Sequence, residues 1–219
     1  MAAIAFETFP ALEALPKIRA VFIQRVPNLD VRTDRDTAMA RLASVHRNIL
    51  DALGFPGRPV ATGHQTHSAH VVRVSLGDTF PVPDCDALVT TDPRIVLGVH
   101  VADCAAVYLA DRKGRGIALA HSGKKGTELG IVALAIEALR AATGASPEDI
   151  IMQISPCIRP PHYEIDFAAD IRRQAKQAGL TDIHDLGICT ASHPDRYYSY
   201  RLEKGRTGRL LAAIAISPP

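Results

Sequence analysis

The strongest constraint on the fold is a crowd of short apolar segments in the middle of the chain. Six stretches with the composition of β-strands follow one another there, at 58–62, 70–75, 86–91, 95–101, 105–111 and 115–121. Prolines 81, 83 and 93 and the Lys113-Gly114 pair interrupt them as turns do. Because these strands cluster instead of alternating strictly with helices, the pattern favours an α+β fold over a doubly wound one.

Three helices are expected around these strands. Residues 33–53 carry apolar side chains at helical spacing and begin with Thr33 and Asp36, which resemble a capping pair. Residues 127–143 are apolar nearly all round, which predicts a buried helix. Residues 166–178 are the third predicted helix, which Gly179 ends. Further strands are expected at 20–25 and 150–154, and 209–217 fits a strand or a helix.

Composition narrows the class of protein. The 219 residues suit one large domain spanning 1–219, and a net charge of +2 without tryptophan argues against nucleic acid as a partner. The longest apolar run has seven residues, too few to span a bilayer, and the N-terminal MAAIAFETFP does not resemble a secretory signal. Four widely spaced cysteines without a C-x-x-C pair then suggest reduced thiols, so we expect a cytoplasmic protein.

Three potential metal ligands lie where expected strands meet loops. His67 ends GHQTH (63–67), Cys104 ends VADC (101–104), and His121 lies in AHSG (120–123). Two imidazoles and a thiolate leave one tetrahedral position open, which is the pattern of catalytic zinc. Zinc at such a site lowers the pKa of a coordinated water and makes it a nucleophile near neutral pH.

The residue types alone leave two other interpretations open. The three residues are 37 and 17 positions apart, and no short metal-binding motif has this spacing. A buried cysteine is commonly a small hydrophobic residue, and a lone histidine is commonly a hydrogen-bonded structural one. Cys104 and His121 also suit a nucleophile and its general base.

The same segments resemble the YfiH-like family, which is also called the laccase-domain or polyphenol oxidase family, the peptidoglycan-editing factors and the multifunctional purine nucleoside phosphorylases. The resemblance runs from about residue 40 to the C-terminus. The matching blocks are QTH (65–67), DALVT (86–90), ADC (102–104), AHSG (120–123), Pro156 with YE (163–164), PD (194–195), YSYR (198–201) and TGR (207–209).

The resemblance implies zinc held by His67, Cys104 and His121 in an α+β fold whose mixed sheets pack between helical layers. It also implies a monomer that acts on purine nucleosides and phosphate. The implied reactions are phosphorolysis of adenosine, inosine, guanosine and methylthioadenosine, and hydrolytic deamination of adenosine. In the deamination Asp103 or a nearby acid would move protons beside Cys104 and His121.

Several candidate substrate contacts surround these ligands. The family usually has Gly-Trp-Arg-Gly after its second histidine, where this chain has Gly-Lys-Lys-Gly at 123–126. Lys for Arg changes how an oxyanion is bound, so Lys124 and Lys125 are expected to affect substrate choice. They either hold phosphate or a substrate hydroxyl before a helix or are a solvated pair at its start. His64, Gln65 and Arg201 complete the predicted contacts. Gln65 is expected to fix its loop, and Arg201 to bind an anion or to hold the C-terminal segment through an ion pair.

Three competing functions remain at this point. The family's older name suggests copper-dependent oxidation of phenols, but nine histidines without H-x-H repeats do not provide for four coppers. One soft N/S site can still bind copper. A metal-free cysteine hydrolase acting on peptidoglycan precursors and a binding protein that has lost turnover are the other two.

Overall fold

The computed structural model describes residues 6–217. Residues 1–5 and 218–219 lie outside the described part. Residues 1–5 are the start of the N-terminal segment that we interpreted as lacking a secretory signal. The elements are β1 (Phe6–Glu7), α1 (Pro10–Glu13), β2 (Ile18–Ile23), α2 (Arg35–Ala52), β3 (Val60–Ala61), β4 (Val71–Arg73), β5 (Ala87–Thr90), β6 (Val96–Val101), β7 (Ala105–Asp111), β8 (Ile117–Ser122), α3 (Lys124–Glu128), α4 (Ile131–Thr143), β9 (Ile150–Ile154), α5 (Phe167–Gln177), β10 (Asp182–Asp185) and β11 (Leu210–Ile216).

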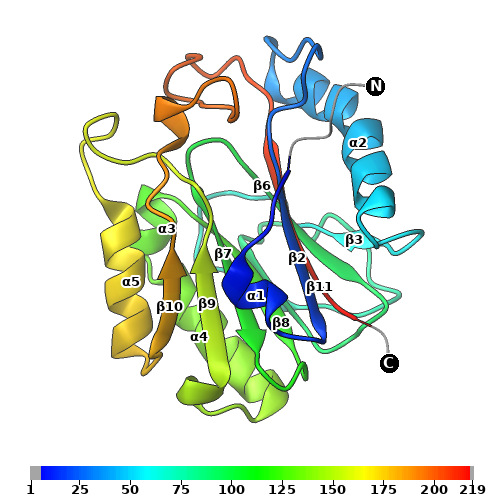
Figure 1. Ribbon diagram of the computed structural model, residues 1–219, viewed down its shortest axis with the longest axis vertical. Helices are drawn as coiled ribbons and strands as arrows, with labels where there is room; N and C mark the ends of the chain where they lie inside the picture. Colours follow the sequence, from blue (N-terminus) through cyan, green and yellow to red (C-terminus); the bar gives the residue numbers. More distant parts are fainter. Residues whose placement is uncertain (1–5, 218–219) are drawn as a thin grey trace.

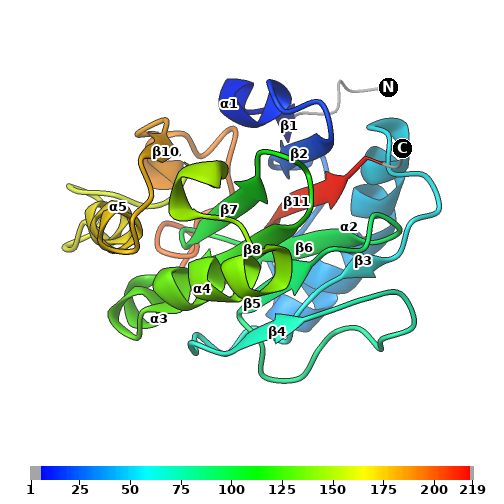
Figure 2. The same ribbon diagram turned by 90° about the horizontal axis from the view of Figure 1, so that it is seen from below.

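Two mixed sheets lie between helices, as expected (Figure 1). The five-stranded sheet has the order β1-β2-β11-β6-β3, and the six-stranded sheet has the order β10-β9-β7-β8-β5-β4. The pairs β3–β6, β4–β5 and β9–β10 are parallel and the other pairs are antiparallel. Figure 2 shows α2 on one side of the molecule and α4 with α5 on the other. This arrangement confirms the α+β fold.

The alternation of side chains along each strand explains the layers. In β11, residues 210, 212, 214 and 216 pack between the two sheets, whereas residues 211, 213 and 215 pack toward α2. In β7, Ala106 and Tyr108 face the core between the sheets, and Val107 and Leu109 face α4 and α5. The Tyr108 hydroxyl donates to the Val21 carbonyl at 2.9 Å, which links the two sheets directly.

The helix predictions need three corrections. Asp34, not the Thr33 and Asp36 pair, caps α2, because its carboxylate accepts the N–H of Thr37. The helix expected over 127–143 is two helices, since Gly130 adopts a left-handed φ of 81° between α3 and α4. Leu129 and Leu134 are 52% and 41% exposed, so the expectation of burial all round is wrong.

The strand predictions hold with small shifts in their ends. The segment 209–217 is the strand β11, and the stretch 58–62 contributes only two residues to a sheet. The short α1 and the edge strand β10 were not expected, because neither has a periodic apolar pattern. Among residues 6–217, no helix combines the length and apolar composition that crossing a bilayer requires.

Candidate metal centre and substrate cavity

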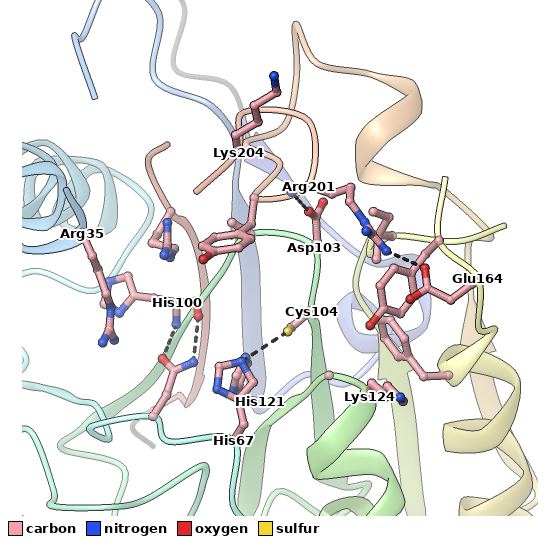
Figure 3. A pocket seen from close by; sticks show the side chains of 18 residues that line it. Arg35, His67, His100, Asp103, Cys104, His121, Lys124, Glu164, Arg201 and Lys204 are labelled. Atoms are coloured by element: carbon pink, nitrogen blue, oxygen red, sulfur yellow. Dashed lines mark hydrogen bonds and ion pairs between the residues drawn. The ribbon is translucent and has the colours of Figure 1, made fainter. Parts of the chain in front are cut away.

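The three predicted metal ligands converge (Figure 3). One ligand atom from each of His67, Cys104 and His121 lies within 4.8 Å of the others. The Cys104 Sγ is 3.9 Å from the Nε2 of His67, and the centroids of the two imidazole rings are 4.8 Å apart. Among the described residues they form the one cluster of three or more such side chains that could hold a metal ion.

The topology brings these residues together at one end of the two sheets. Cys104 lies in the link between β6 and β7, where the chain crosses from the five-stranded to the six-stranded sheet. His121 follows Ile117 and Leu119 at alternate positions of β8, on the side that faces the other sheet. His67 lies in the loop after β3 with a left-handed φ of 60°. Because a non-glycine residue is rarely found there, this loop is held in shape by contacts around it.

Asp86 supplies those contacts. Its Oδ2 accepts the N–H groups of Thr66 and Ser68 at 3.1 and 2.7 Å and the Ser68 hydroxyl at 2.8 Å. Its Oδ1 accepts the N–H of His67 at 3.0 Å and Nδ1–H of His121 at 2.8 Å. One carboxylate therefore shapes the first ligand loop and orients the third ligand with Nε2 free.

The motifs of the sequence did not indicate a role for Asp86 in the site. Asp86 appears in them only as the first letter of the DALVT block. The residue is 1% exposed at the head of β5, where four apolar or small residues follow it. An acidic residue beside a fully buried strand needs partners for its charge, and that signal was available from the sequence.

The charges of Cys104, His121 and Asp86 are coupled. Burial raises the pKa of Cys104, but the neighbouring His121 and His67 lower it further, so the net shift is downward. Burial lowers the pKa of His121, but Cys104 and Asp86 raise it more. Burial also raises the pKa of Asp86, and hydrogen bonds from His121 and Ser68 outweigh this and hold it well below its usual range. The thiolate, which is the form that ligates metals, is thus favoured near neutral pH.

The residues present fit a tetrahedral metal ion. Bond lengths to zinc imply separations of about 3.4–3.6 Å between tetrahedral N and S ligands, so the ligand atoms need to approach by only about 1 Å. Gly123 leaves room for the thiol, because a Cβ at this position would lie 2.5 Å from the Cys104 Sγ. Nitrogen and sulfur donors of this kind suit zinc and also copper.

The fourth side of the cluster opens into a cavity of about 700 Å³. This volume is within the range of pockets that hold small molecules the size of a nucleoside. Ile158, Tyr163, Phe167 and Tyr200 provide the apolar and aromatic part of its wall. The cavity therefore combines flat apolar surfaces with a possible metal ion and charged side chains.

Asp103 lies in the wall of the cavity and is 7% exposed. Its Oδ1 accepts the hydroxyl of Thr190 at 2.7 Å, and its Oδ2 accepts the Ser199 hydroxyl at 3.0 Å and the Arg201 N–H at 2.7 Å. Its own φ of 84° is left-handed. These contacts anchor the segment around residue 200 to the loop that carries the cysteine ligand.

Three predicted substrate contacts line the cavity. Gln65 exchanges two hydrogen bonds with the backbone of His100, at 2.8 and 3.1 Å, which fixes its loop. Arg201 pairs with Glu164 at 2.5 Å and stacks over the Tyr163 ring at 4.9 Å. Lys124 is the first residue of α3 and lies 4.0 Å from Glu128.

Two predicted contacts lie elsewhere. His64 and Lys125 are exposed and are not part of the cavity wall, and both lysines belong to α3 itself instead of preceding a helix. The cavity is lined instead by residues to which the sequence analysis gave no role, namely Arg35, His100, Glu164, Lys204 and Arg209. No short-range pattern marks them, since they come together only through the packing of β6, α2 and the segments before α5 and β11.

The sequence of this chain is similar to those of known proteins. The model of the family described as multi-copper polyphenol oxidoreductase laccase matches residues 24–170 and 162–217. A purine nucleoside phosphorylase of Deinococcus radiodurans is 30% identical over 215 residues, which cover 86% of this chain and 81% of the relative. Purine nucleoside phosphorylase Rv2149c of Mycobacterium tuberculosis is 33% identical over 201 residues, which cover 80% and 79%.

Solved structures agree with the fold. YlmD from Geobacillus stearothermophilus superposes with a TM-score of 0.80 at 22% identity, over 99% of this chain and 100% of that one. YfiH from Bacillus licheniformis gives 0.81 at 21% identity, over 91% and 93%. The resemblance seen in the sequence is thereby confirmed, and the chain belongs to the multi-copper polyphenol oxidoreductase laccase family, which includes the YfiH-like proteins.

Proposed function

We propose that this protein is a zinc-dependent purine nucleoside phosphorylase that also deaminates adenosine. The observation that carries the proposal is the open cluster of His67, Cys104 and His121 in the wall of a nucleoside-sized cavity. The names of the relatives from Deinococcus and Mycobacterium support the substrate class. A purine nucleoside and phosphate are then the partners of this site.

In the proposed site the metal is held by the Sγ of Cys104 and one imidazole nitrogen each of His67 and His121. When bound, zinc supplies a Lewis acid that activates water near neutral pH. Asp86 keeps the Nδ1 of His121 protonated, so that Nε2 carries the lone pair for ligation. We assign Cys104 and His121 to the reacting centre for this reason.

The other residues bind and orient the nucleoside. Tyr163 and Phe167, whose ring centroids are 5.9 Å apart, offer an aromatic wall against which a purine can stack. Glu164 and Arg201 are charged groups at the same end, suited to the hydrogen-bonding edge of the base. We assign Asp103 a positioning role instead of proton transfer, because its carboxylate already accepts three hydrogen bonds.

The family description favours copper-dependent oxidation of polyphenols as a second candidate. The observation that argues against it is the number of sites: one cluster of ligands occurs among residues 6–217. Oxidation at several coppers needs several clusters, whereas one N₂S site can take up copper without using it. Metal analysis of protein purified from unsupplemented cells separates the two functions by the ion that is present.

The test incubates the purified protein with adenosine, with and without phosphate, and separates the products by chromatography. We expect inosine in both samples, and adenine with ribose 1-phosphate only where phosphate is present. Cys104→Ala should lose both reactions, whereas Cys189→Ala, a free cysteine of similar partial exposure outside the cavity, should keep them. If the wild type forms neither product, the proposal is contradicted. Full activity after chelation of metals would indicate a cysteine hydrolase.

A further inference from the structure

One end of the cavity is lined by basic groups from three distant parts of the chain. Arg35 is the first residue of α2, His100 lies in β6, and Arg209 immediately precedes β11. Figure 3 shows Arg35 and His100 at the end opposite Glu164 and Arg201, with the three metal ligands between. The cavity therefore has two different ends.

Among residues 6–217, no acidic side chain forms an ion pair with this group. Within the described part of the chain, neither Arg35 nor Arg209 forms an ion pair, in contrast to Arg201, which Glu164 contacts at 2.5 Å. Nη1 of Arg209 donates to the carbonyls of Thr207 and Gly208 at 3.1 and 3.0 Å, which fixes the guanidinium and leaves its other N–H groups for a ligand. Burial, followed by the charge of Arg35, lowers the pKa of Arg209.

The position of Arg35 also indicates a role outside its own helix. The N-terminus of α2 carries the positive end of the helix dipole, so a cation there is unfavourable for the helix. Two guanidinium groups at an unpaired site cost free energy that an anion would recover. A residue that breaks a local rule in this way is commonly part of a binding site.

His100 adds a neutral donor to the two cations. Burial, and then the nearby His46, Arg35 and Arg209, lower its pKa to about 3, so the imidazole is uncharged at neutral pH. Its ring stacks on that of His46 at 5.9 Å, and its backbone is held on both sides by Gln65. The ring is therefore positioned by its neighbours before any ligand arrives.

We propose that Arg35, His100 and Arg209 form the subsite that binds inorganic phosphate, the nucleophile of phosphorolysis. This inference rests on the proposed function. Arginine grips a phosphate with two parallel N–H donors, and two arginines can balance the charge of a dianion. The subsite differs from the sequence-based expectation of phosphate at Lys124 and Lys125, since Lys125 lies outside the cavity.

The chemistry of the step balances with phosphate as the only co-reactant. A phosphate oxygen forms a bond to C1′ of the ribose while the C1′–N9 bond of the nucleoside breaks. The electron pair of that bond goes to the purine, which takes up the proton that phosphate gives up. The products are ribose 1-phosphate and the free base, and nothing is oxidised or reduced.

The experiment compares two reactions in the same protein. Phosphorolysis of adenosine requires phosphate and deamination does not, so Arg35→Gln and Arg209→Gln should each raise the KM for phosphate at least about tenfold. The loss should be larger for phosphorolysis than for deamination, because only phosphorolysis uses phosphate. Arg140→Gln, which removes an exposed charge on α4 outside the cavity, is the matched control and should change neither rate.

Binding of inorganic phosphate measured by calorimetry separates this inference from the proposed function. If adenosine is not turned over but phosphate binds at least about tenfold more weakly to Arg35→Gln than to the wild type, the subsite stands and the proposed function fails. Unchanged phosphate affinity and KM in Arg35→Gln overturn the subsite, as does a wild type that neither binds nor uses phosphate. Arg35 is exposed, so this variant serves even if Arg209→Gln does not fold.

A nucleotide 5′-phosphate shares the chemistry of inorganic phosphate, and adenosine 5′-monophosphate distinguishes the two. If the nucleotide binds through Arg35 while inorganic phosphate neither binds nor competes, the subsite recognises nucleotides and the inference is wrong. Competition between phosphate and the nucleotide, with the arginine variants weakening both, supports it.

Discussion

Replacing Asp86 by asparagine should weaken both the fold and the metal centre, and the structure allows the size of the effect to be worked out. Oδ1 accepts hydrogen bonds from the His67 N–H and the His121 ring, and Oδ2 accepts four from Thr66 and Ser68. Asparagine keeps one oxygen and turns the other into a donor. At least two hydrogen bonds are therefore lost, whichever way the amide points.

Each lost hydrogen bond to a charged group costs about 1.5–3 kcal/mol, so the free energy of unfolding should fall by about 3–6 kcal/mol. That is a large part of the stability of an ordinary domain, about 5–15 kcal/mol. The affinity for zinc should fall about 10- to 100-fold, because His121 loses the partner that orients it and the loop of His67 loses its anchor.

Urea unfolding followed by circular dichroism measures the first effect, and competition with a chromophoric chelator measures the second. Asp84→Asn is the matched control, because it removes the same charge from an exposed residue two positions away. We expect this control to unfold within about 0.5 kcal/mol of the wild type. The reasoning is refuted if Asp86→Asn matches the control in both assays.

Three further predictions follow from the same geometry. Gly123→Ala should reduce zinc affinity at least about tenfold while the fold is kept, because the new Cβ would lie 2.5 Å from the Cys104 Sγ. Competition with a chelator measures this affinity, and an unchanged value contradicts the prediction. After metal removal at pH 7, iodoacetamide should modify Cys104 before the other cysteines, because His121 and His67 lower the pKa of its thiol; mass spectrometry of the modified peptides would show another order if this is wrong. Burial lowers the pKa of His46 to about 4, so the unfolded chain binds more protons than the folded chain between pH 6.5 and 4, and stability falls as the pH falls. His46→Leu should therefore remove about 2 kcal/mol of the difference in unfolding free energy between pH 7 and pH 4.5. An unaltered difference in urea unfolding argues against this prediction.

The sequence alone determined most of the elements and singled out the three candidate metal ligands. The nearly continuous apolar runs of β7, β8 and β11 are a local signal, because a strand that is buried on both faces must carry apolar residues wherever it lies in the fold. Cys104 and His121 lie at an end of β7 and β8, whereas His67 lies in the loop after β3, and the family blocks around all three indicated a shared metal site. The boundary between α3 and α4 was missed because Gly130 has little effect on an apolar pattern.

Only the tertiary structure decided how the rest of the site is made. Asp86 contacts residues 66–68 and His121, and these partners depend on how β5 lies beside β8 and the loop before β4. Arg35, His100 and Arg209 lie far apart in the chain and meet because α2, β6 and β11 pack in adjacent layers. Strand register and the packing of layers are set by many weak contacts across the whole chain, so no local pattern could show which charged residues would share the cavity.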